Sequence, residues 1–346
     1  MTAPRGPWVL VVGMHRSGTS AVTGSLGALG LGVVRPGDRM DWPESNPEHW
    51  ESLSLTGLNN DLLARLDGAW DAPPGFPPGW ELSPAVADAP DPDPLLAAAY
   101  PEPGPLVFKD PRLSLLLPYW RSVLAGPLAA VLMWRSPTAV AHSLLRRDGL
   151  PVVEGLALWE RYNRAALEGL EGVDTFVLRY EALVGDPAGP VADLVDWLSS
   201  LGQFAALADG WDRPAAASAI TDELHHHGTA GDADPLVPPE QRELVDRLGS
   251  LAGGHRPFPR VDLGAESAWT TSVLRLRQEL SAPRRELDAA RDLLRLTRNE
   301  LESTKAGMAN LRASTSWRIT GPLRSLTTAV GGIRHRPPPG PAGRDD

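Results

Sequence analysis

Short apolar runs alternate with amphipathic segments along the first 200 residues. Continuous apolar stretches predict buried strands at Val9–Val12, Leu106–Lys109, Ala129–Trp134 and Thr175–Arg179. Apolar residues at helical spacing predict helices at Thr19–Leu29, Leu53–Leu66, Leu113–Leu124, Thr138–Arg147, Leu156–Leu170 and Val191–Leu201. Strands that alternate with helices in this way indicate an α/β fold, with a parallel sheet in a three-layer arrangement flanked by helices.

The pattern changes near Val261. The segment Ala265–Arg312 is charged and helical in character, and apolar residues recur every seven positions at Val273, Leu280, Leu287, Leu294, Leu301 and Met308. The companion seam is weaker and contains Pro283. Two interpretations follow: a coiled coil that supports self-association or partner binding, or an amphipathic helix folded back on the globular domain.

Three regions are therefore expected, at residues 1–262, 263–314 and 315–346. The first is globular, the second is a helical or coiled-coil segment, and the third is a basic, proline-rich and largely disordered tail. Within the globular region, the Pro/Asp/Gly-rich stretch Trp70–Pro94 is expected to be irregular.

Composition narrows the partners. The 346 residues carry a formal net charge of −10, so nucleic acid is not an expected partner and any positive site must be local. The chain has no cysteine, which excludes disulfides and thiolate metal sites. No apolar run is long enough to span a bilayer and the N-terminus does not resemble a signal peptide, so a cytoplasmic location is expected, with a membrane-peripheral one left open.

The first strand runs into the loop Gly13-Met14-His15-Arg16-Ser17-Gly18-Thr19-Ser20. A glycine-bounded loop between a strand and a helix N-terminus directs backbone N–H groups at an anion, so the fold is expected to be P-loop-like. The spacing of Gly13 and Gly18 matches the start of G-x-x-x-x-G-K-[ST], but Thr19 occupies the lysine position. The cation lies earlier instead, at Arg16.

Two further strand ends carry basic residues. Arg135 follows Ala129–Trp134, and Ser143 lies eight positions later, so a guanidinium and a hydroxyl can converge on one phosphate. The alternative is an arginine paired with a carboxylate and a solvent-facing serine. Lys109-Asp110-Pro111-Arg112 follows Leu106–Lys109, and there Asp110 is expected to have a structural role in a salt-bridge network.

The segment Glu44–Glu51 contributes carboxylates and an imidazole beyond the first helix. A general base must reach the proton of an acceptor at hydrogen-bond distance, and Glu51 and His49 are both candidates. The alternative is an acidic loop that caps the helix beginning near Leu53.

Four motifs, in this order, resemble the bacterial branch of the PAPS-dependent sulfotransferase family: HRSGTS, KDPR, RSPTAVAHSLLRRDG and RYEALVGDP. Enzymes of that family transfer a sulfuryl group from 3′-phosphoadenosine 5′-phosphosulfate (PAPS). The resemblance covers about Trp8–Trp197 and extends more weakly to Val261. It implies that the 5′-phosphosulfate is bound by the loop residues His15, Arg16, Ser17, Gly18, Thr19 and Ser20. It also implies that Arg135 and Ser143 bind the 3′-phosphate.

The stretch from Asn46-Pro47 to Glu51 resembles a bacterial branch whose glutamate there serves as base, which favours Glu51 over His49. Tyr180-Glu181 resembles a strand-end pair of the family and is expected to be structural. Separately, Lys109 is expected to assist the transfer. Arg16 departs from the family because many members have lysine there, which keeps the charge and changes its geometry. The implied activity is transfer of a sulfuryl group from PAPS to a hydroxyl of a saccharide, glycolipid or other small acceptor, with PAPS as co-substrate and no metal. The sulfotransferase domain would be residues 1–262.

Other features are less specific. Ser316–Arg324 resembles a segment that follows coiled coils in bacterial glycosyltransferases of surface-glycan assembly, which favours a saccharide acceptor. Adjacent histidines at His225–His227 indicate a polar loop rather than a metal site, with a contribution to PAPS binding as an alternative. Several tryptophans can either stack on a sugar or fill the core: Trp42, Trp50, Trp70 and Trp80.

Two rival functions remain. A P-loop nucleotide-dependent kinase requires a lysine after Gly18 and a metal-binding aspartate at a strand end, and the strand Ala129–Trp134 ends in Arg135 instead. A non-catalytic nucleotide-binding scaffold would act through Ala265–Arg312, and the intact loop with its Arg/Ser pair disfavours it.

Overall fold

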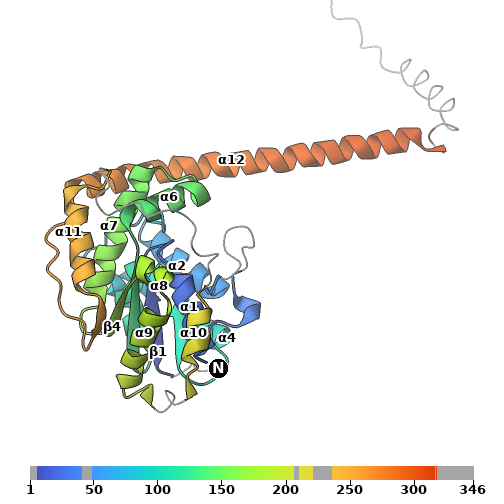
Figure 1. Cartoon of the computed structure of the whole chain (residues 1–346). Helices are drawn as coiled ribbons and strands as arrows, with labels where there is room; N and C mark the ends of the chain where they lie inside the picture. The colour runs from blue at the N-terminus through green and yellow to red at the C-terminus, as the bar shows by residue number, and fades with distance from the viewer. Residues whose placement is uncertain (1–5, 41–48, 206–209, 221–235, 316, 318–346) are drawn as a thin grey trace, which may run out of the picture. The chain divides into compact units, whose positions relative to one another are not determined.

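The computed structural model describes residues 6–40, 49–205, 210–220, 236–315 and 317, and gives only the backbone at 282–289, 291–292 and 311–312. It divides into two compact units, Met1–Leu280 and Ser281–Asp346. Figure 1 shows the first unit as helices packed around a sheet, and the helix α12 (Ala268–Ala313) as a single continuous element.

The first unit is built on a five-stranded sheet in the order β2-β1-β3-β4-β5. The strands are β1 (Trp8–Val12), β2 (Leu106–Lys109), β3 (Leu128–Trp134), β4 (Asp174–Arg179) and β5 (Gly253–His255). β1 to β4 are mutually parallel, whereas β5 pairs antiparallel with β4. The predicted α/β class with a mostly parallel sheet is therefore confirmed.

Alternating side chains of β1 belong to two separate hydrophobic cores. Trp8, Leu10 and Val12 belong to one cluster, and Val9 and Val11 belong to the other. Both faces of the sheet are covered by helices, which is why the parallel strands read as continuous apolar runs.

The helices that cover the sheet follow the predicted periodicity closely. They are α1 (Thr19–Ala28), α2 (Leu53–Arg65), α5 (Leu113–Val123), α6 (Pro137–Asp148), α7 (Val152–Gly169) and α9 (Ala188–Ser200). One core contains residues of α1 and α9, and the other contains residues of α2, α5 and α7. This arrangement is the three-layer architecture that the alternation of strands and helices predicts.

The sequence-based interpretation of Trp70–Pro94 as irregular is wrong in part. This stretch contains η2 (Trp80–Leu82) and α3 (Pro84–Ala87), and α4 (Asp93–Ala99) begins within it. Trp80 is 6% exposed and packs on Phe76 with ring centroids 5.0 Å apart, so Trp80 fills the core. Proline at the start of a helix is compatible with helical backbone, which explains how so proline-rich a segment is ordered.

Several elements have no counterpart in the sequence-based prediction. They are η1 (Pro36–Asp38), α8 (Tyr180–Gly185), α10 (Arg213–Ser218), α11 (Pro239–Ser250) and β5. Apart from α11, which has 12 residues, these elements have six residues or fewer, too few for periodicity to separate from a loop.

The first turns of α12 are part of the first unit and are fixed by buried polar contacts. The carboxylate of Glu160 in α7 accepts hydrogen bonds from the backbone N–H and hydroxyl of Ser267 and from the hydroxyl of Thr270. Further along, Arg277 forms ion pairs with Asp71 and Glu154. Leu274 is 2% exposed, so these turns also contribute to the core.

The predicted region boundaries, 1–262, 263–314 and 315–346, stay predictions. None of the helices in the described part of the chain is both long enough and apolar enough to cross a membrane.

Candidate active site

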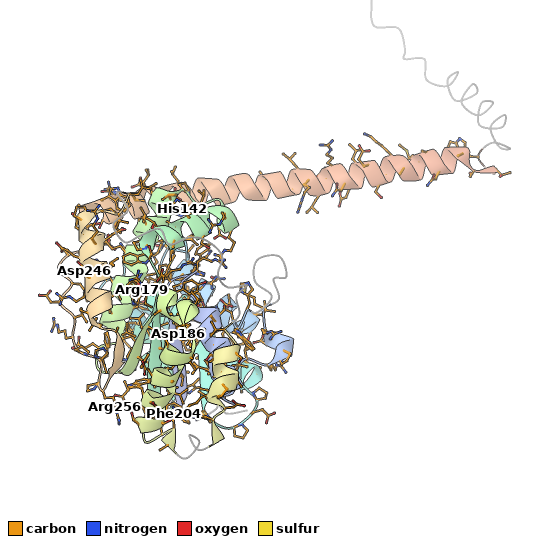
Figure 2. The ribbon with its side chains drawn as sticks, in the orientation of Figure 1. His142, Arg179, Asp186, Phe204, Asp246 and Arg256 are labelled. Carbon is orange, nitrogen blue, oxygen red and sulfur yellow. The ribbon has the colours of Figure 1, made fainter. Side chains whose placement is uncertain are left out.

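The carboxyl ends of the four parallel strands meet at one edge of the sheet. β1 lies between β2 and β3, and because the chain passes from β1 to β2 on one side and returns to β3 on the other, the ends of β1 and β3 border a switch point of the fold. Gly13 and Arg135 directly follow β1 and β3, and Lys109 and Arg179 are the last residues of β2 and β4. Figure 2 labels Arg179 at the end of β4, next to α8.

The loop between β1 and α1 depends on two glycines. Gly18 has φ 93°, and a Cβ there would lie 2.3 Å from the ring of Tyr180. Gly13 has φ 152°, and a Cβ there would lie 2.3 Å from the carbonyl oxygen of Met133. Neither position tolerates a side chain, so the backbone of the loop is packed directly against β3 and α8.

Some hydrogen-bond donors of the loop are used within the protein. The N–H of Gly13 donates to the hydroxyl of Ser114 at 3.0 Å, and the hydroxyl of Ser17 donates to the carbonyl of Met14 at 2.6 Å. Within the described residues, no acceptor is found for the N–H groups of Thr19 and Ser20 in the first turn of α1. A helix N-terminus with such donors is a binding site for an anion.

Arg16 stands at the centre of the loop in an uncommon backbone conformation, with φ 69°. Its Nε donates to the hydroxyl oxygen of Ser143 in α6 at 2.8 Å, which joins two positions 127 residues apart. Burial, together with the neighbouring cations Arg147 and Arg135, lowers the pKa of Arg16 to about 10. The guanidinium therefore remains charged at neutral pH, in surroundings that favour an anionic partner.

Arg135 lies against the same loop. Its guanidinium donates to the carbonyl of Arg16 at 3.2 Å and stacks over the ring of Tyr180 with 4.3 Å between Cζ and the ring centroid. Burial lowers the pKa of Arg135. Arg16, Arg135 and Ser143, which the sequence nominated from separate motifs, are thus brought together in one place.

The backbone around Arg135 is fixed by hydrogen bonds to the side chains of Trp159 and Glu181. The indole N–H of Trp159 in α7 donates to the carbonyl of Arg135 at 2.8 Å. The carboxylate of Glu181 accepts from the N–H of Ser136 at 3.0 Å and from Arg179 at 2.9 Å. The Tyr180-Glu181 pair therefore fixes the turn after β3.

A second group of charges lies at the end of β2. The ammonium of Lys109 donates to the Glu51 carboxylate, forming a buried ion pair, and to the hydroxyl of Ser20 in the first turn of α1 at 3.1 Å. Nδ1 of His49 lies 3.3 Å from the other carboxylate oxygen of Glu51. Lys109 thus bridges Glu51 and the helix N-terminus.

The electrostatics of this group favour an ionised carboxylate. Burial opposes ionisation of Glu51, but Lys109 and His49 outweigh it and lower the pKa of the carboxyl well below its usual range. A carboxylate held in this way can accept a proton, but it is a weak base as long as Lys109 stays on it.

His15 has different surroundings. Its ring lies 4.5 Å from Trp70 and 5.9 Å from Tyr162, between centroids, and the hydroxyl of Tyr162 donates to the carbonyl of Trp70. Burial and the nearby Arg112 and Arg147 lower the pKa of His15 well below its usual value. His15 is therefore neutral and forms an aromatic wall with Trp70.

The buried carboxylate of Asp110 has a structural environment. It accepts hydrogen bonds from Thr56 and Asn59 of α2 and from the backbone N–H and guanidinium of Arg112. These contacts tie the turn after β2 to α2, the arrangement expected of a structural aspartate.

Some candidates lie outside the described residues, namely Glu44, Trp42, His225–His227 and the segment Ser316–Arg324 except Trp317. In the described residues, no group of three or more metal-ligating side chains lies close together. Two contributors to the site were missed by sequence reasoning: the Ser114 hydroxyl and the Trp159 indole. Both act through contacts distant in sequence.

Fold and site together define an α/β protein with a glycine-bounded loop and several basic side chains at the carboxyl edge of a mostly parallel sheet. No family model matches the sequence, and no curated protein matches it either. Among solved structures, the sulfotransferase domain from the Synechococcus PCC 7002 olefin synthase aligns with a TM-score of 0.36 and 16% sequence identity, over 80% of this chain and 95% of that chain. A TM-score of 0.36 is too low to assign a function or a family.

Proposed function

We propose that the protein is a sulfotransferase that uses PAPS and modifies a hydroxyl of a saccharide, glycolipid or other small acceptor. The observation that carries the proposal is the convergence of Arg16, Arg135 and Ser143 at the loop between β1 and α1. Two guanidinium groups and a hydroxyl, next to a helix N-terminus, suit a nucleotide with phosphates at two positions.

The donor set fits such a nucleotide on its own chemistry. The first-turn N–H groups of α1 and Arg16 would hold the 5′-phosphosulfate, while Arg135 and Ser143 would hold the 3′-phosphate. When bound, PAPS supplies the sulfuryl group, whose bond to the 5′-phosphate oxygen breaks as the acceptor oxygen takes it up. The loop donors and Arg16 stabilise the negative charge that develops on the leaving phosphate.

Lys109 connects this anion site with the candidate base. Its ammonium reaches Ser20 in the first turn of α1 and the carboxylate of Glu51. An anion at the helix N-terminus competes with Glu51 for Lys109, and any weakening of the Lys109–Glu51 pair raises the pKa of the carboxyl. Glu51 then becomes a better acceptor for the hydroxyl proton.

The test is nucleotide-dependent thermal stability of the full chain. Adenosine 3′,5′-bisphosphate should raise the Tm more than adenosine 5′-monophosphate or ATP with Mg²⁺, because a ligand that binds only the folded state stabilises it. The Arg135→Ala variant should bind the bisphosphate about 100-fold more weakly, since charge-assisted hydrogen bonds to the 3′-phosphate are lost. It should bind the monophosphate almost as well as the parent does.

Arg242→Ala is the matched control, because Arg242 is an exposed arginine on α11. It should leave both affinities unchanged. Stabilisation by ATP with Mg²⁺ in preference to the bisphosphate would favour a P-loop kinase, and no stabilisation by any nucleotide would overturn the proposed nucleotide site.

A further inference from the structure

The part of α12 in the second unit carries apolar side chains that its own unit leaves exposed. Leu294 is 70% exposed, Leu301 is 51% exposed and Met308 is 48% exposed. Consecutive members of this set are seven residues apart, so they lie along one stripe of the helix. Such a stripe is unfavourable in water unless another surface covers it.

The stripe fits the a positions of a heptad repeat. With Leu280, Leu287, Leu294, Leu301 and Met308 at a, the d positions are Pro283, Ala290, Thr297, Thr304 and Leu311. Pro283 and the anchored turns before Leu280 mark the start of the repeat. From residue 284 to residue 312 the helix covers about four heptads and about 43 Å, enough for a coiled coil.

The charges beside the seam are segregated by position. Every e position from residue 284 onward is basic: Arg284, Arg291, Arg298, Lys305 and Arg312. Of the g positions, Glu279, Glu286 and Glu300 are acidic, and Leu293 and Gly307 are uncharged. In the described part of the helix, Lys305 also pairs with Glu302 on its own helix at 3.1 Å.

This pattern determines the orientation of a partner helix. In a parallel pair, each g residue faces the e residue of the next heptad on the partner, so glutamates meet arginines or lysine. In an antiparallel pair of identical helices, each e position faces an e position and each g position faces a g position. Like charges then lie opposite each other and repel. The charges therefore complement a second copy of the same helix only in the parallel orientation.

We propose that residues 284–312 form a parallel, in-register, two-stranded coiled coil with a second copy of this chain. Basic residues at every e position border the apolar stripe on one side, and Leu293 at g extends it by one residue on the other. A stripe of this width suits two strands rather than three or four. Small residues at d and an incomplete set of g glutamates make the dimer modest in strength.

The absence of cysteine allows a direct test in the full chain. Thr297→Cys and Thr304→Cys each place one thiol at a d position, and Asn299→Cys places one at an f position on the opposite side of the helix. In a parallel, in-register dimer both d-position variants should form a disulfide-linked dimer on mild oxidation, and the f-position control should not.

An antiparallel pair faces each d position with an a position, so neither d-position variant would cross-link. That result, or equal cross-linking of all three variants, would overturn the proposal. Sedimentation equilibrium of the parent chain should give twice the chain mass, and a monomer at about 100 μM or a trimer would also contradict it.

A charge exchange tests the register independently. Glu300→Lys and Lys305→Glu should each raise the dimer Kd on the order of tenfold, because two attractive pairs per dimer become repulsive. The double variant E300K/K305E should return the Kd to near the parent value, because the pairs are restored with opposite polarity. Additive weakening in the double variant would show that residues 300 and 305 of the two chains do not meet.

Discussion

At the scale of single residues, Glu51 and His49 lie so close together that either can act as the base. We expect Glu51→Gln to lower kcat at least 100-fold while leaving nucleotide affinity within a few-fold, because the amide cannot accept the hydroxyl proton. Since Lys109 and His49 lower the pKa of Glu51 well below its usual range in the free protein, kcat/KM of the parent should show no titration of Glu51 between pH 5 and pH 8. Steady-state kinetics with PAPS and a saccharide acceptor measure both.

His49→Gln is the companion variant. If His49→Gln lowers kcat as strongly as Glu51→Gln does, then His49 takes the proton through Nε2, and Glu51 orients the ring. A kcat of His49→Gln within a few-fold of the parent would keep Glu51 as the base.

His15 should make folding stability depend on pH. Its pKa is lowered in the folded state, so below about pH 6.5 the unfolded chain binds a proton that the folded chain does not. This contribution is unfavourable as pH falls, and the free energy of unfolding should decrease by about 1 kcal/mol between pH 7 and pH 5.5 from this group alone.

The difference between the parent and His15→Gln isolates the effect, since the other titrating groups are shared. Urea unfolding at pH 7 and pH 5.5 measures the free energy of unfolding. Its change between the two pH values should be smaller in His15→Gln than in the parent by about 1 kcal/mol. Equal dependence in the two proteins would mean that the pKa of His15 is the same in the folded and unfolded states.

Site residues that lie within a motif could be predicted from the sequence, and those that act across the fold could not. Arg16, Arg135 and Ser143 belong to patterns in which spacing carries the information. The acceptor for the Gly13 N–H is Ser114, 101 residues away, and nothing near Ser114 distinguishes it from any other helical serine.

At the scale of elements, the start of α12 holds the loop that carries Trp70. Arg277 donates to the carbonyl of Asp71 and forms ion pairs with Asp71 and Glu154, and Gln278 donates to the carbonyl of Asp67 at 2.8 Å. Trp70 in turn lies on His15 of the anion-binding loop. Helix α12 therefore supports a wall of the candidate site without contributing a side chain to it.

We expect Arg277→Ala to lower the free energy of unfolding by about 2 kcal/mol, because it leaves two partly buried carboxylates without their cation. Arg275→Ala is the matched control: Arg275 is exposed and pairs with Glu279 at 3.9 Å, so its loss should change stability by less than about 0.5 kcal/mol. Chemical denaturation measures both, and equal effects would mean that the Arg277 pairs do not stabilise the fold.

Element prediction succeeded where an apolar run had a clear boundary. β2 matches its predicted bounds residue for residue, because three apolar residues end at Lys109 and the charged turn after it. Composition predicts an irregular stretch at Trp70–Pro94, but the short helices found there depend on the burial of Trp80 and Val86 in the core. Composition alone does not contain that tertiary contribution.

At the scale of the whole molecule, the alternation of strands and helices was sufficient to predict the α/β class and its three layers. It was insufficient for the strand order and for the antiparallel β5, whose sequence Gly253–His255 has no apolar pattern. Strand order depends on which pairings bury most surface, and a linear pattern does not specify that.

The left-handed backbone of Arg16 has a consequence for how this loop evolves. A non-glycine residue at φ 69° costs on the order of 1 kcal/mol, and its charge lies beside Arg135 and Arg147. Glycine at position 16 would relieve both the backbone strain and the repulsion. A chain shaped by thermal robustness alone would therefore lose this arginine, and its presence agrees with the anion-binding role that we propose for it.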